Sequence, residues 1–585
     1  MYQKKTYHKR KIIIVALGFM LVVVLLCTRL GYLMIKESSY YQKLALELHQ
    51  RERAIKAERG LIYDRNGMVL ASNKAVCTIS VIHSQITDKE EVIARLQQEL
   101  GLEEDYIRKR VEKVSSREKI KSNVEKEVAD NIRSYQLDGV MIDEDYKRYY
   151  PYETLASKVL GFTGSDNQGI VGLEVKYDSY LSGKSGKILT LTDARGVEIP
   201  NAAEMREEPV AGNTLVTSID LNIQKYVEQA SIKAMKAHSA QRVSTIIMNP
   251  QNGEIYAMAN VPEFNLNEPY TVIDSLKNEE NGENTQELLN QMWRNPSVND
   301  TYEPGSTFKI VTATAGLEEK VVTVNDTFSC PGFRIVEDRK IRCHKSGGHG
   351  QETFKQGIMN SCNPVFMDIG ARVGKEAMYQ TYEKLGLFEK TGIDVPGEAK
   401  SIMHKLENIK AVELATMSFG QSFQITPLEL LRAASAVING GTLVTPHFGV
   451  AIQTKDGQKV ETLTYPKKEQ VIRKETSELM KELLEAVVFE GSGKNAKIEG
   501  FRIGGKTATS EKLPRRSGKY ISSFLGFAPA NDPQVIALIM IDEPVGTYYG
   551  GTIAAPVVKE IFENILPYLG IKQEYIATQD SKIVE

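Results

Sequence analysis

The feature that most constrains this chain is an apolar run near its N-terminus. Residues 12–28 read IIIVALGFMLVVVLLCT and contain no charge, and after Arg29 the apolar stretch continues to Ile35. A helix over 12–35 is long enough to cross a hydrocarbon core of roughly 30 Å, with Arg29 reaching toward one interface. The basic stub over 1–11 is expected to stay in the cytoplasm, so residues after 36 should lie outside the cell membrane.

Two other N-terminal signals compete with a retained single span. A cleaved signal peptide needs small residues at its cleavage site, and no small-x-small pattern follows the apolar run. A lipoprotein anchor at Cys27 is disfavoured because Leu26 is not the small residue that such processing usually needs. The sequence therefore favours a retained membrane helix.

Size and composition set broad limits on the rest of the chain. A chain of 585 residues is too long for one compact core, so two or more domains are expected. The formal net charge of -2 gives no reason to expect nucleic-acid binding. Five cysteines in so long a chain exclude a disulfide scaffold.

The composition of the sequence changes twice after the predicted membrane helix. Residues 36–235 are charged, with helical stretches and short strand candidates, and predict a first extracytoplasmic domain. Residues 240–570 are more apolar and are often interrupted by turn-forming residues, which predicts a second domain. Residues 571–585 are expected to be a polar tail.

The second domain contains the pattern of an antiparallel sheet. STIIMNPQNGEIYAMAN is two apolar runs around Asn252-Gly253, a strong hairpin signal. GFRIGGKTATS, ISSFLGFAP and QVIALIMID are three further strand candidates near the C-terminus, with helical stretches between the two groups. Two early strands and three late strands predict an α/β domain whose sheet is closed by both ends of the domain.

A serine and a lysine stand one turn apart in EPGSTFKI at 303–310. Pro304 and Gly305 are typical of a helix start, so Ser306 and Lys309 should share one helix face. A desolvated lysine with a lowered pKa can take the proton of a serine hydroxyl, and the helix N-terminus offers N–H groups to an oxyanion. Ser-x-x-Lys also occurs by chance, as at Ser116-Lys119, so this pair alone would be weak.

Two later segments strengthen the hypothesis of a serine acyl-transfer site. NSCNP supplies Ser361 and Asn363, and GGKTATS supplies Lys506 and Thr507 on a predicted strand. This set and order resemble the penicillin-binding transpeptidases. TYEPGSTFK, FGQSFQITPLELLRAASAVINGG at 419–441 and FLGFAPANDPQVIALIMIDEP at 524–544 are also similar to that family.

The first half resembles the membrane-proximal module of class B, monofunctional members. RGLIYDRNGMVLASN at 59–73, RYYPYETLASKVLGFTG at 148–164 and GIVGLEVKYDSYLSG at 169–183 carry this likeness. The resemblance implies a transpeptidase domain of the serine β-lactamase-like α/β class over 240–570, with helices on both faces of a five-stranded antiparallel sheet. An elongated α+β pedestal or dimerisation domain is expected over 36–235.

Other copies of the motifs are set aside by their context. Lys390-Thr391-Gly392 spells the family's Lys-Thr-Gly but follows the end of a helix, so it is predicted to be a loop. Lys184-Ser185-Gly186 lies in the other domain, ahead of the nucleophile. SDN at 165–167 and SVN at 297–299 also precede Ser306 and are predicted to be turns.

The mechanism that the resemblance implies is a two-step acyl transfer between peptidoglycan stem peptides. The acyl-enzyme forms on the serine, penicillins mimic the D-alanyl-D-alanine end and trap it, and no cofactor or metal is implied. The implied site residues are the nucleophile Ser306, its base Lys309, the proton relay Ser361, the amide-holding Asn363, the carboxylate-binding Lys506 and Thr507, and Thr509, whose N–H joins that of Ser306 in the oxyanion hole.

Ala508 departs from the family, which has glycine there, and its methyl group is expected to alter the fit of substrate or antibiotic. Cys330 and Cys343 flank a predicted hairpin and could form a disulfide or remain free thiols. Cys362 is interpreted as a small buried residue, and His349 as a loop-packing residue.

Three functional classes stay open. The first is a membrane-anchored cross-linking transpeptidase, the second a β-lactam-hydrolysing or β-lactam-sensing relative, and the third a catalytically weakened scaffold of the division or sporulation machinery. TSEKLPRRSGKYISSFLGFAP is most similar to sporulation-type and division-type members. The resemblance also implies a multi-span glycan polymerase as partner.

Overall fold

The computed structural model describes residues 4–115, 117–191, 205–277 and 284–574. The start of the predicted stub, Ser116 and most of the predicted tail lie outside these residues. The chain forms two compact units. The first unit comprises Met1–Glu58, Ala75–Lys147 and Lys184–Val210, and the second comprises Arg59–Lys74, Arg148–Gly183 and Ala211–Glu585.

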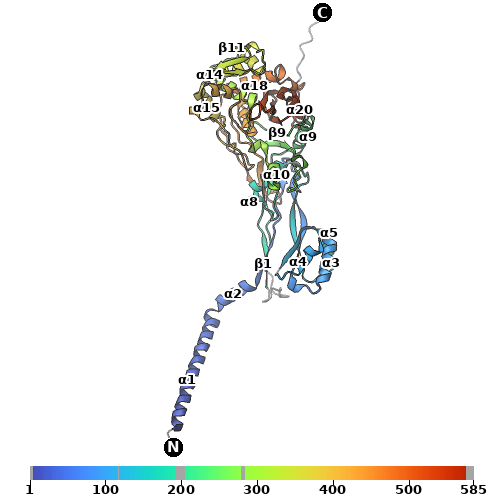
Figure 1. The fold of residues 1–585 in the computed structure, drawn as a ribbon, viewed down its shortest axis with the longest axis vertical. Coiled ribbons are helices and arrows are strands. Elements are labelled where there is room, and N and C mark those ends of the chain that lie inside the picture. Colours follow the sequence, from blue (N-terminus) through green and yellow to red (C-terminus); the bar gives the residue numbers. More distant parts are fainter. Residues whose placement is uncertain (1–3, 116, 192–204, 278–283, 575–585) are drawn as a thin grey trace. The chain divides into compact units, whose positions relative to one another are not determined.

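The N-terminal helix of the first unit is apolar along most of its length. Helix α1 (Lys4–Gly31) continues through a π-helical turn over Tyr32–Lys36 (Figure 1). Within the described residues, the segment Lys9–Lys36 is the one helical stretch long and apolar enough to cross a membrane, with a mean hydropathy of 2.8. It includes the predicted span over 12–35.

The rest of the first unit packs helices against strands. The segment 89–114 forms two helices, because Gly101 ends the first one with a left-handed backbone, φ +61°. Val92, Leu96, Ile107 and Ile132 are fully or almost fully buried in this core. The elements are α2 (Ser38–His49), β1 (Gln50–Ile55), α3 (Lys89–Leu100), α4 (Glu104–Val111), β4 (Glu118–Glu125), α5 (Lys126–Ser134), β6 (Gly186–Leu191) and β7 (Met205–Glu207), with parts of β3 (Val69–Val81) and β5 (Val140–Tyr149).

The second unit contains the predicted five-stranded antiparallel sheet. Its strand order is β10-β9-β19-β18-β17, so the early hairpin joins the late strands edge to edge. The prediction of a sheet closed by both ends of the domain is confirmed. The strands are β9 (Arg242–Met248), β10 (Ile255–Val261), β17 (Gly504–Glu511), β18 (Tyr520–Ala528) and β19 (Val535–Asp542).

Both faces of this sheet are buried, as the resemblance to the transpeptidase family implies. Along β19, Ile536 and Leu538 point into one core, whereas Ala537 and Ile539 point into the other. Helices α9 (Leu221–Ala237) and α20 (Ala555–Tyr568) cover the second face and lie side by side although they come from opposite ends of the domain (Figure 1).

Helices inserted between the two groups of strands cover the other face. The helical stretches predicted between the strand groups are present as α12 (Lys309–Glu318), α15 (Lys375–Lys384), α17 (Pro427–Ile438) and α18 (Lys474–Phe489). The tripeptide at 297–299 is in a short helix, not the predicted turn, because Asn295 caps it and Pro296 starts it. The other helices are α10 (Thr285–Trp293), α11 (Pro296–Asn299), α13 (Phe354–Met359), α14 (Asn363–Val373), α16 (Ala411–Met417) and α19 (Gly550–Ile553).

Smaller elements complete the second unit. The β12–β13 hairpin pairs Phe333 with Arg342 and confirms the hairpin predicted between Cys330 and Cys343. The short elements are β2 (Ile62–Tyr63), α6 (Ser157–Leu160), α7 (Gly172–Lys176), α8 (Asp178–Leu181), β8 (Thr214–Thr217), β11 (Thr327–Cys330), β12 (Phe333–Val336), β13 (Arg339–Arg342), β14 (Gly350–Thr353), β15 (Gly449–Gln453) and β16 (Lys459–Thr462).

A buried ion cluster joins the early segments of the second unit. Glu174 accepts a hydrogen bond from Arg59 Nε at 2.6 Å and another from Arg148 Nε at 2.6 Å. The hydroxyl of Tyr150 donates to the same carboxylate at 3.1 Å. Because Glu174 and Arg59 are almost fully buried, each charge depends on its partners for stabilisation.

Candidate active site

Ser306 lies in a tight turn at the entrance of helix α12. The sequence predicted a helix start here, and the structure has one 3₁₀ turn over Gly305–Phe308 before α12 begins at Lys309. Residues three apart eclipse one another in a 3₁₀ turn, so Ser306 and Lys309 stay on one side of it. Ser306 is half-buried, and Lys309 is buried.

The turn depends on two glycines that touch each other. Gly305 has φ +57° and donates its N–H to the carbonyl of Gly420 at 2.9 Å. A Cβ on Gly420 would lie 2.0 Å from the Gly305 carbonyl oxygen. The segment 419–441 therefore supports the Ser306 turn through the backbone of Gly420.

Lys309 holds the segment around Ser361. Its Nζ lies 2.6 Å from the Ser361 carbonyl oxygen, 3.2 Å from Ser361 Oγ and 2.7 Å from Asn363 Oδ1. No hydrogen bond among the described residues joins Lys309 Nζ to Ser306 Oγ. Burial lowers the pKa of Lys309 from 10.5 to about 8, so a useful fraction of the amine is neutral near neutral pH.

Ser361 has an unusual backbone for a residue with a side chain. Its φ is +53°, in the left-handed region, and helix α14 begins two residues later with Pro364 in its first turn. Non-glycine residues in this region cost free energy and are common at functional sites. The conformation directs the Ser361 hydroxyl toward both buried lysines.

Lys506 reaches the same hydroxyl from the sheet edge. Its Nζ donates to Ser361 Oγ at 2.8 Å and to the carbonyl of Thr507 at 3.1 Å. Burial, followed by repulsion from Lys309, lowers the pKa of Lys506 well below its usual value. The predicted residues Lys309, Ser361, Asn363 and Lys506 therefore converge.

Thr507 and Thr509 lie on the edge strand β17. Thr507 Oγ1 donates to Ser492 Oγ at 3.1 Å, and Thr509 Oγ1 accepts from the N–H of Gly550 at 3.1 Å. Neither Ser492 nor Gly550 was predicted, because neither belongs to a recognised sequence pattern. Between the threonines, Ala508 is only 3 % exposed, so its methyl group presents little surface to the cleft.

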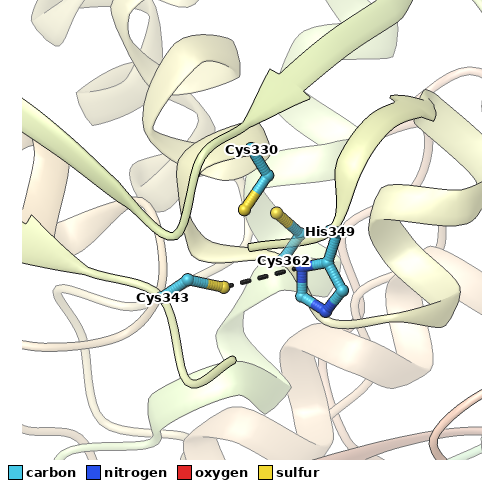
Figure 2. A group of neighbouring side chains, drawn as sticks. All are labelled: Cys330, Cys343, His349 and Cys362. Atoms are coloured by element: carbon cyan, nitrogen blue, oxygen red, sulfur yellow. Dashed lines mark hydrogen bonds between the residues drawn. The ribbon is translucent and has the colours of Figure 1, made fainter. Parts of the chain in front are cut away.

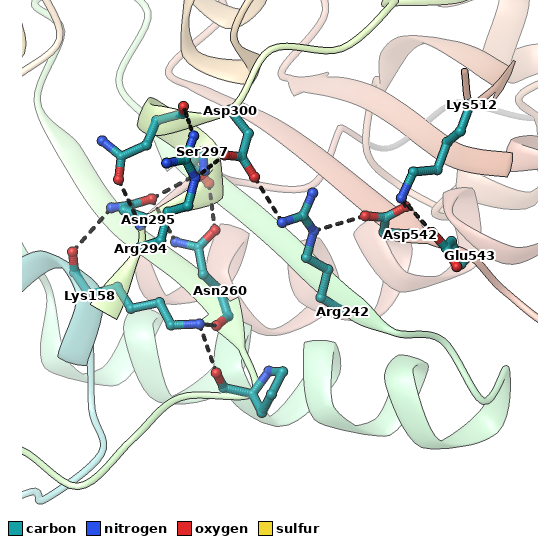
Figure 3. A network of polar contacts seen from close by, with 12 residues as sticks. Lys158, Arg242, Asn260, Arg294, Asn295, Ser297, Asp300, Lys512, Asp542 and Glu543 are labelled. Carbon is teal, nitrogen blue, oxygen red and sulfur yellow. Dashed lines mark hydrogen bonds and ion pairs between the residues drawn. The ribbon is translucent and has the colours of Figure 1, made fainter. Parts of the chain in front are cut away.

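A polar network holds the chain that leads into Ser306 (Figure 3). Arg242 of β9 donates to Asp300 at 2.8 Å and to Asp542 of β19 at 2.8 Å. Lys512 also binds Asp542, at 2.9 Å. These residues border a cavity of about 200 Å³, and they fix the segment after α11 to the sheet.

The structure explains why the rejected motif copy is not part of the site. Lys390-Thr391-Gly392 lies in a loop, as predicted. Both the N–H and the hydroxyl of Thr391 donate to Glu398 Oε1, so this threonine serves the loop itself. In contrast, β17 pairs along its length with β18, as predicted for the strand that carries Lys506.

Two family models match the chain and cover most of it. The penicillin binding protein transpeptidase domain matches residues 243–563, and the penicillin-binding protein dimerisation domain matches residues 54–217. Stage V sporulation protein D of Bacillus subtilis is 38 % identical over 578 residues, covering 97 % of this chain and 87 % of that protein. Peptidoglycan D,D-transpeptidase FtsI of Escherichia coli is 27 % identical, covering 91 % and 87 % of the two chains.

Solved structures share the fold at lower identity. Penicillin-binding protein 2X from Streptococcus thermophilus has a TM-score of 0.73 at 20 % identity, covering 90 % of this chain and 83 % of that one. Penicillin-binding protein 3 of Mycobacterium tuberculosis, solved with ampicillin, has a TM-score of 0.68 at 22 % identity, with 90 % and 98 % covered. At these identities the likeness concerns the fold.

Proposed function

Because this chain belongs to the class B penicillin-binding proteins, we propose that Ser306 is the nucleophile of a peptidoglycan D,D-transpeptidase. The activity class is that of its named relatives, which are peptidoglycan D,D-transpeptidases. The observation that carries the residue assignment is the Ser361 hydroxyl within hydrogen-bond reach of both Lys309 and Lys506.

In the first step, Ser306 Oγ attacks the carbonyl carbon between the two terminal D-alanines of a stem peptide. Neutral Lys309 takes the hydroxyl proton, and its lowered pKa supports this role. The N–H groups of Ser306 and Thr509 stabilise the oxyanion of the tetrahedral intermediate. The C–N bond then breaks, and terminal D-alanine leaves with a proton delivered through Ser361.

In the second step, an amine of a neighbouring stem peptide attacks the ester carbonyl of the acyl-enzyme. Its proton returns through Ser361 and Lys309, the ester bond to Ser306 breaks, and a new amide cross-links the two strands. The contact between Lys309 Nζ and Ser361 Oγ supports one proton path for both steps.

The remaining residues position the donor peptide. Asn363 holds a substrate amide through its side chain, and Lys506 with Thr507 binds the terminal carboxylate. Penicillins carry an equivalent carboxylate and amide, and open their four-membered ring on Ser306. The ampicillin complex of the Mycobacterium tuberculosis relative is consistent with this antibiotic class as a ligand.

We also propose a membrane location and partners. Helix α1 anchors the chain, residues 1–11 remain in the cytoplasm, and the dimerisation domain over 36–235 and the transpeptidase domain over 240–570 lie outside. The apolar character of Lys9–Lys36 supports the anchor. A multi-span glycan polymerase would supply uncross-linked glycan strands to this site.

Acylation of the full-length protein in detergent tests the proposal. Fluorescent penicillin should label the wild type at Ser306, as located by mass spectrometry of peptides, and should not label Ser306→Ala. Slow release of the label supports a transpeptidase, whereas rapid hydrolysis would indicate a β-lactamase-like enzyme. Absence of labelling in folded wild-type protein would favour the scaffold alternative and overturn the proposal.

A further inference from the structure

Three cysteines and a histidine converge next to the proposed active site. The sulfur atoms of Cys330, Cys343 and Cys362 and one ring nitrogen of His349 all lie within 4.8 Å of one another. Figure 2 shows the three sulfur atoms and the imidazole directed toward a common point. The cysteines are buried and none forms a disulfide. The sequence alone predicts only separate packing roles for Cys362 and His349.

The ligand atoms match the composition of a zinc site, and they lie close enough together for one ion to draw them in. Three thiolates and one imidazole are a common set for structural zinc, with Zn–S about 2.3 Å and Zn–N about 2.0–2.1 Å. Tetrahedral geometry then separates neighbouring ligand atoms by about 3.6–3.8 Å. Cys343 Sγ lies 3.7 Å from His349 Nδ1, so at least one edge already has that length.

A buried carboxylate beside the group has an unmet polar requirement. Among the described residues, Glu352 Oε2 has no hydrogen-bond partner, and its side chain is 2 % exposed. It lies 3.8 Å from His349 Nδ1, while the other oxygen accepts from Asn360 at 2.6 Å. A buried carboxyl group that lacks a partner on one oxygen is stabilised by a nearby cation, such as a metal ion held by the thiols and the imidazole.

We propose that Cys330, Cys343, His349 and Cys362 bind one zinc ion. Binding displaces a proton from each of the three thiols and uses the neutral imidazole, so the site carries a net charge of -1 with the metal. The thiolate-rich set selects zinc over magnesium or calcium, which prefer oxygen ligands.

The position of the site gives the metal a structural task. Cys330 and Cys343 flank the β12–β13 hairpin, and Cys362 lies between Ser361 and Asn363. Asn363 Nδ2 also donates to the carbonyl of Arg342, at the end of the hairpin, at 3.1 Å. The zinc ion would thus fasten the hairpin to the turn that holds the Ser361 backbone at φ +53°.

Metal analysis of the full-length protein in detergent tests the site directly. Wild-type protein purified without chelator should contain one zinc ion per chain, as measured by elemental mass spectrometry. Cys343→Ser should contain at least about tenfold less. Cys77→Ser should retain the zinc, because Cys77 is a buried thiol outside the group. Zinc retained at one per chain by Cys343→Ser would overturn the proposal.

A measurement on unmutated protein guards against a variant that fails to fold. Wild-type protein stripped by a chelator should take up one cobalt ion and develop thiolate-to-cobalt charge-transfer absorption, which zinc should abolish. Failure to bind either metal, with five reactive thiols after denaturation, would overturn the proposal. Loss of two thiols to a Cys330–Cys343 disulfide would overturn it as well.

The effect on catalysis rests on the proposed function and needs a separate readout. Metal-free protein should react with penicillin about tenfold more slowly than the zinc form and recover when zinc is restored. Zinc binding with an unchanged acylation rate would overturn the fastening role. Zinc binding without any labelling of Ser306 would instead contradict the proposed transpeptidase.

Discussion

Ser361 Oγ lies 2.8 Å from Lys506 Nζ, although 145 positions separate the two residues along the chain. The same hydroxyl is 3.2 Å from Lys309 Nζ. Two buried amines therefore share one small polar group, and burial lowers the pKa of both. Burial is what lowers the pKa of Lys309, whereas repulsion from Lys309 adds to burial in lowering the pKa of Lys506.

The pH dependence of acylation should follow Lys309. A pKa of about 8 leaves about a tenth of the amine neutral at pH 7 and about a hundredth at pH 6. Because the neutral form is the base, the rate constant for penicillin acylation should rise about tenfold per pH unit below 8 and level off above it. Stopped-flow labelling between pH 6 and 9.5 measures this, and a flat profile would contradict the assignment.

Lys506→Met should reduce the second-order rate constant of penicillin acylation by about 10²–10³-fold, because it removes the amine that binds the carboxylate. The control is Lys390→Met, in the loop copy of the same tripeptide, which should react at the wild-type rate. Competition with labelled penicillin gives both values. Equal losses in the two variants would argue against Lys506 as the carboxylate ligand.

Gly420→Ala should disturb the Ser306 turn. The added Cβ would lie 2.0 Å from the Gly305 carbonyl oxygen, and Gly420 has φ +85°. Gly440→Ala is a matched control, with φ +87° and no atom within 4 Å of its Cβ. Both variants should lose about 1–2 kcal/mol of unfolding free energy, because alanine is strained at positive φ. Only Gly420→Ala should also slow acylation, by more than about tenfold. Thermal melts and labelling rates on both variants separate the two effects.

Ala508→Gly should change penicillin acylation less than about threefold, because the methyl group is almost fully covered. Its cost should instead appear in stability, at about 0.5–1 kcal/mol for glycine within a strand. Labelling rates and the melting temperature measure the two quantities. A large gain in acylation would show that the methyl group alters the fit of the antibiotic, as predicted from the sequence.

Glu174→Gln should destabilise the second unit by about 3–5 kcal/mol, because it leaves Arg59 and Arg148 buried with one fewer negative charge. Asp178→Asn is the comparison. The Asp178 side chain is 34 % exposed and, of the two arginines, it pairs with Arg59 and not with Arg148. This substitution should cost about 1 kcal/mol or less. Denaturant titration with matched m-values provides the numbers, and equal losses would contradict the stated role of burial.

Local patterns in the sequence were sufficient for the elements of the second unit. Alternating and continuous apolar runs predicted the five strands, and Asn252-Gly253 predicted the β9–β10 hairpin. The helices between them were also predicted, because each has its own periodicity and end signals. Two boundaries differed: the start at Ser306 is a 3₁₀ turn, and 297–299 is a short helix.

The sequence by itself determined the apolar N-terminal helix, the order of the strands in the chain and the residues that meet around Ser361. Hydrophobic periodicity and family sequence motifs are local properties, so they can be recognised without the fold. The tertiary structure alone decided which hydroxyl both lysines contact, which glycines touch behind Ser306, and that Cys330, Cys343, His349 and Cys362 share one small volume. Those relationships depend on how loops, a hairpin and a helix start pack on one another. Side chains far apart in the chain meet only once the core is packed. No local sequence pattern contains information on the spatial distance between them.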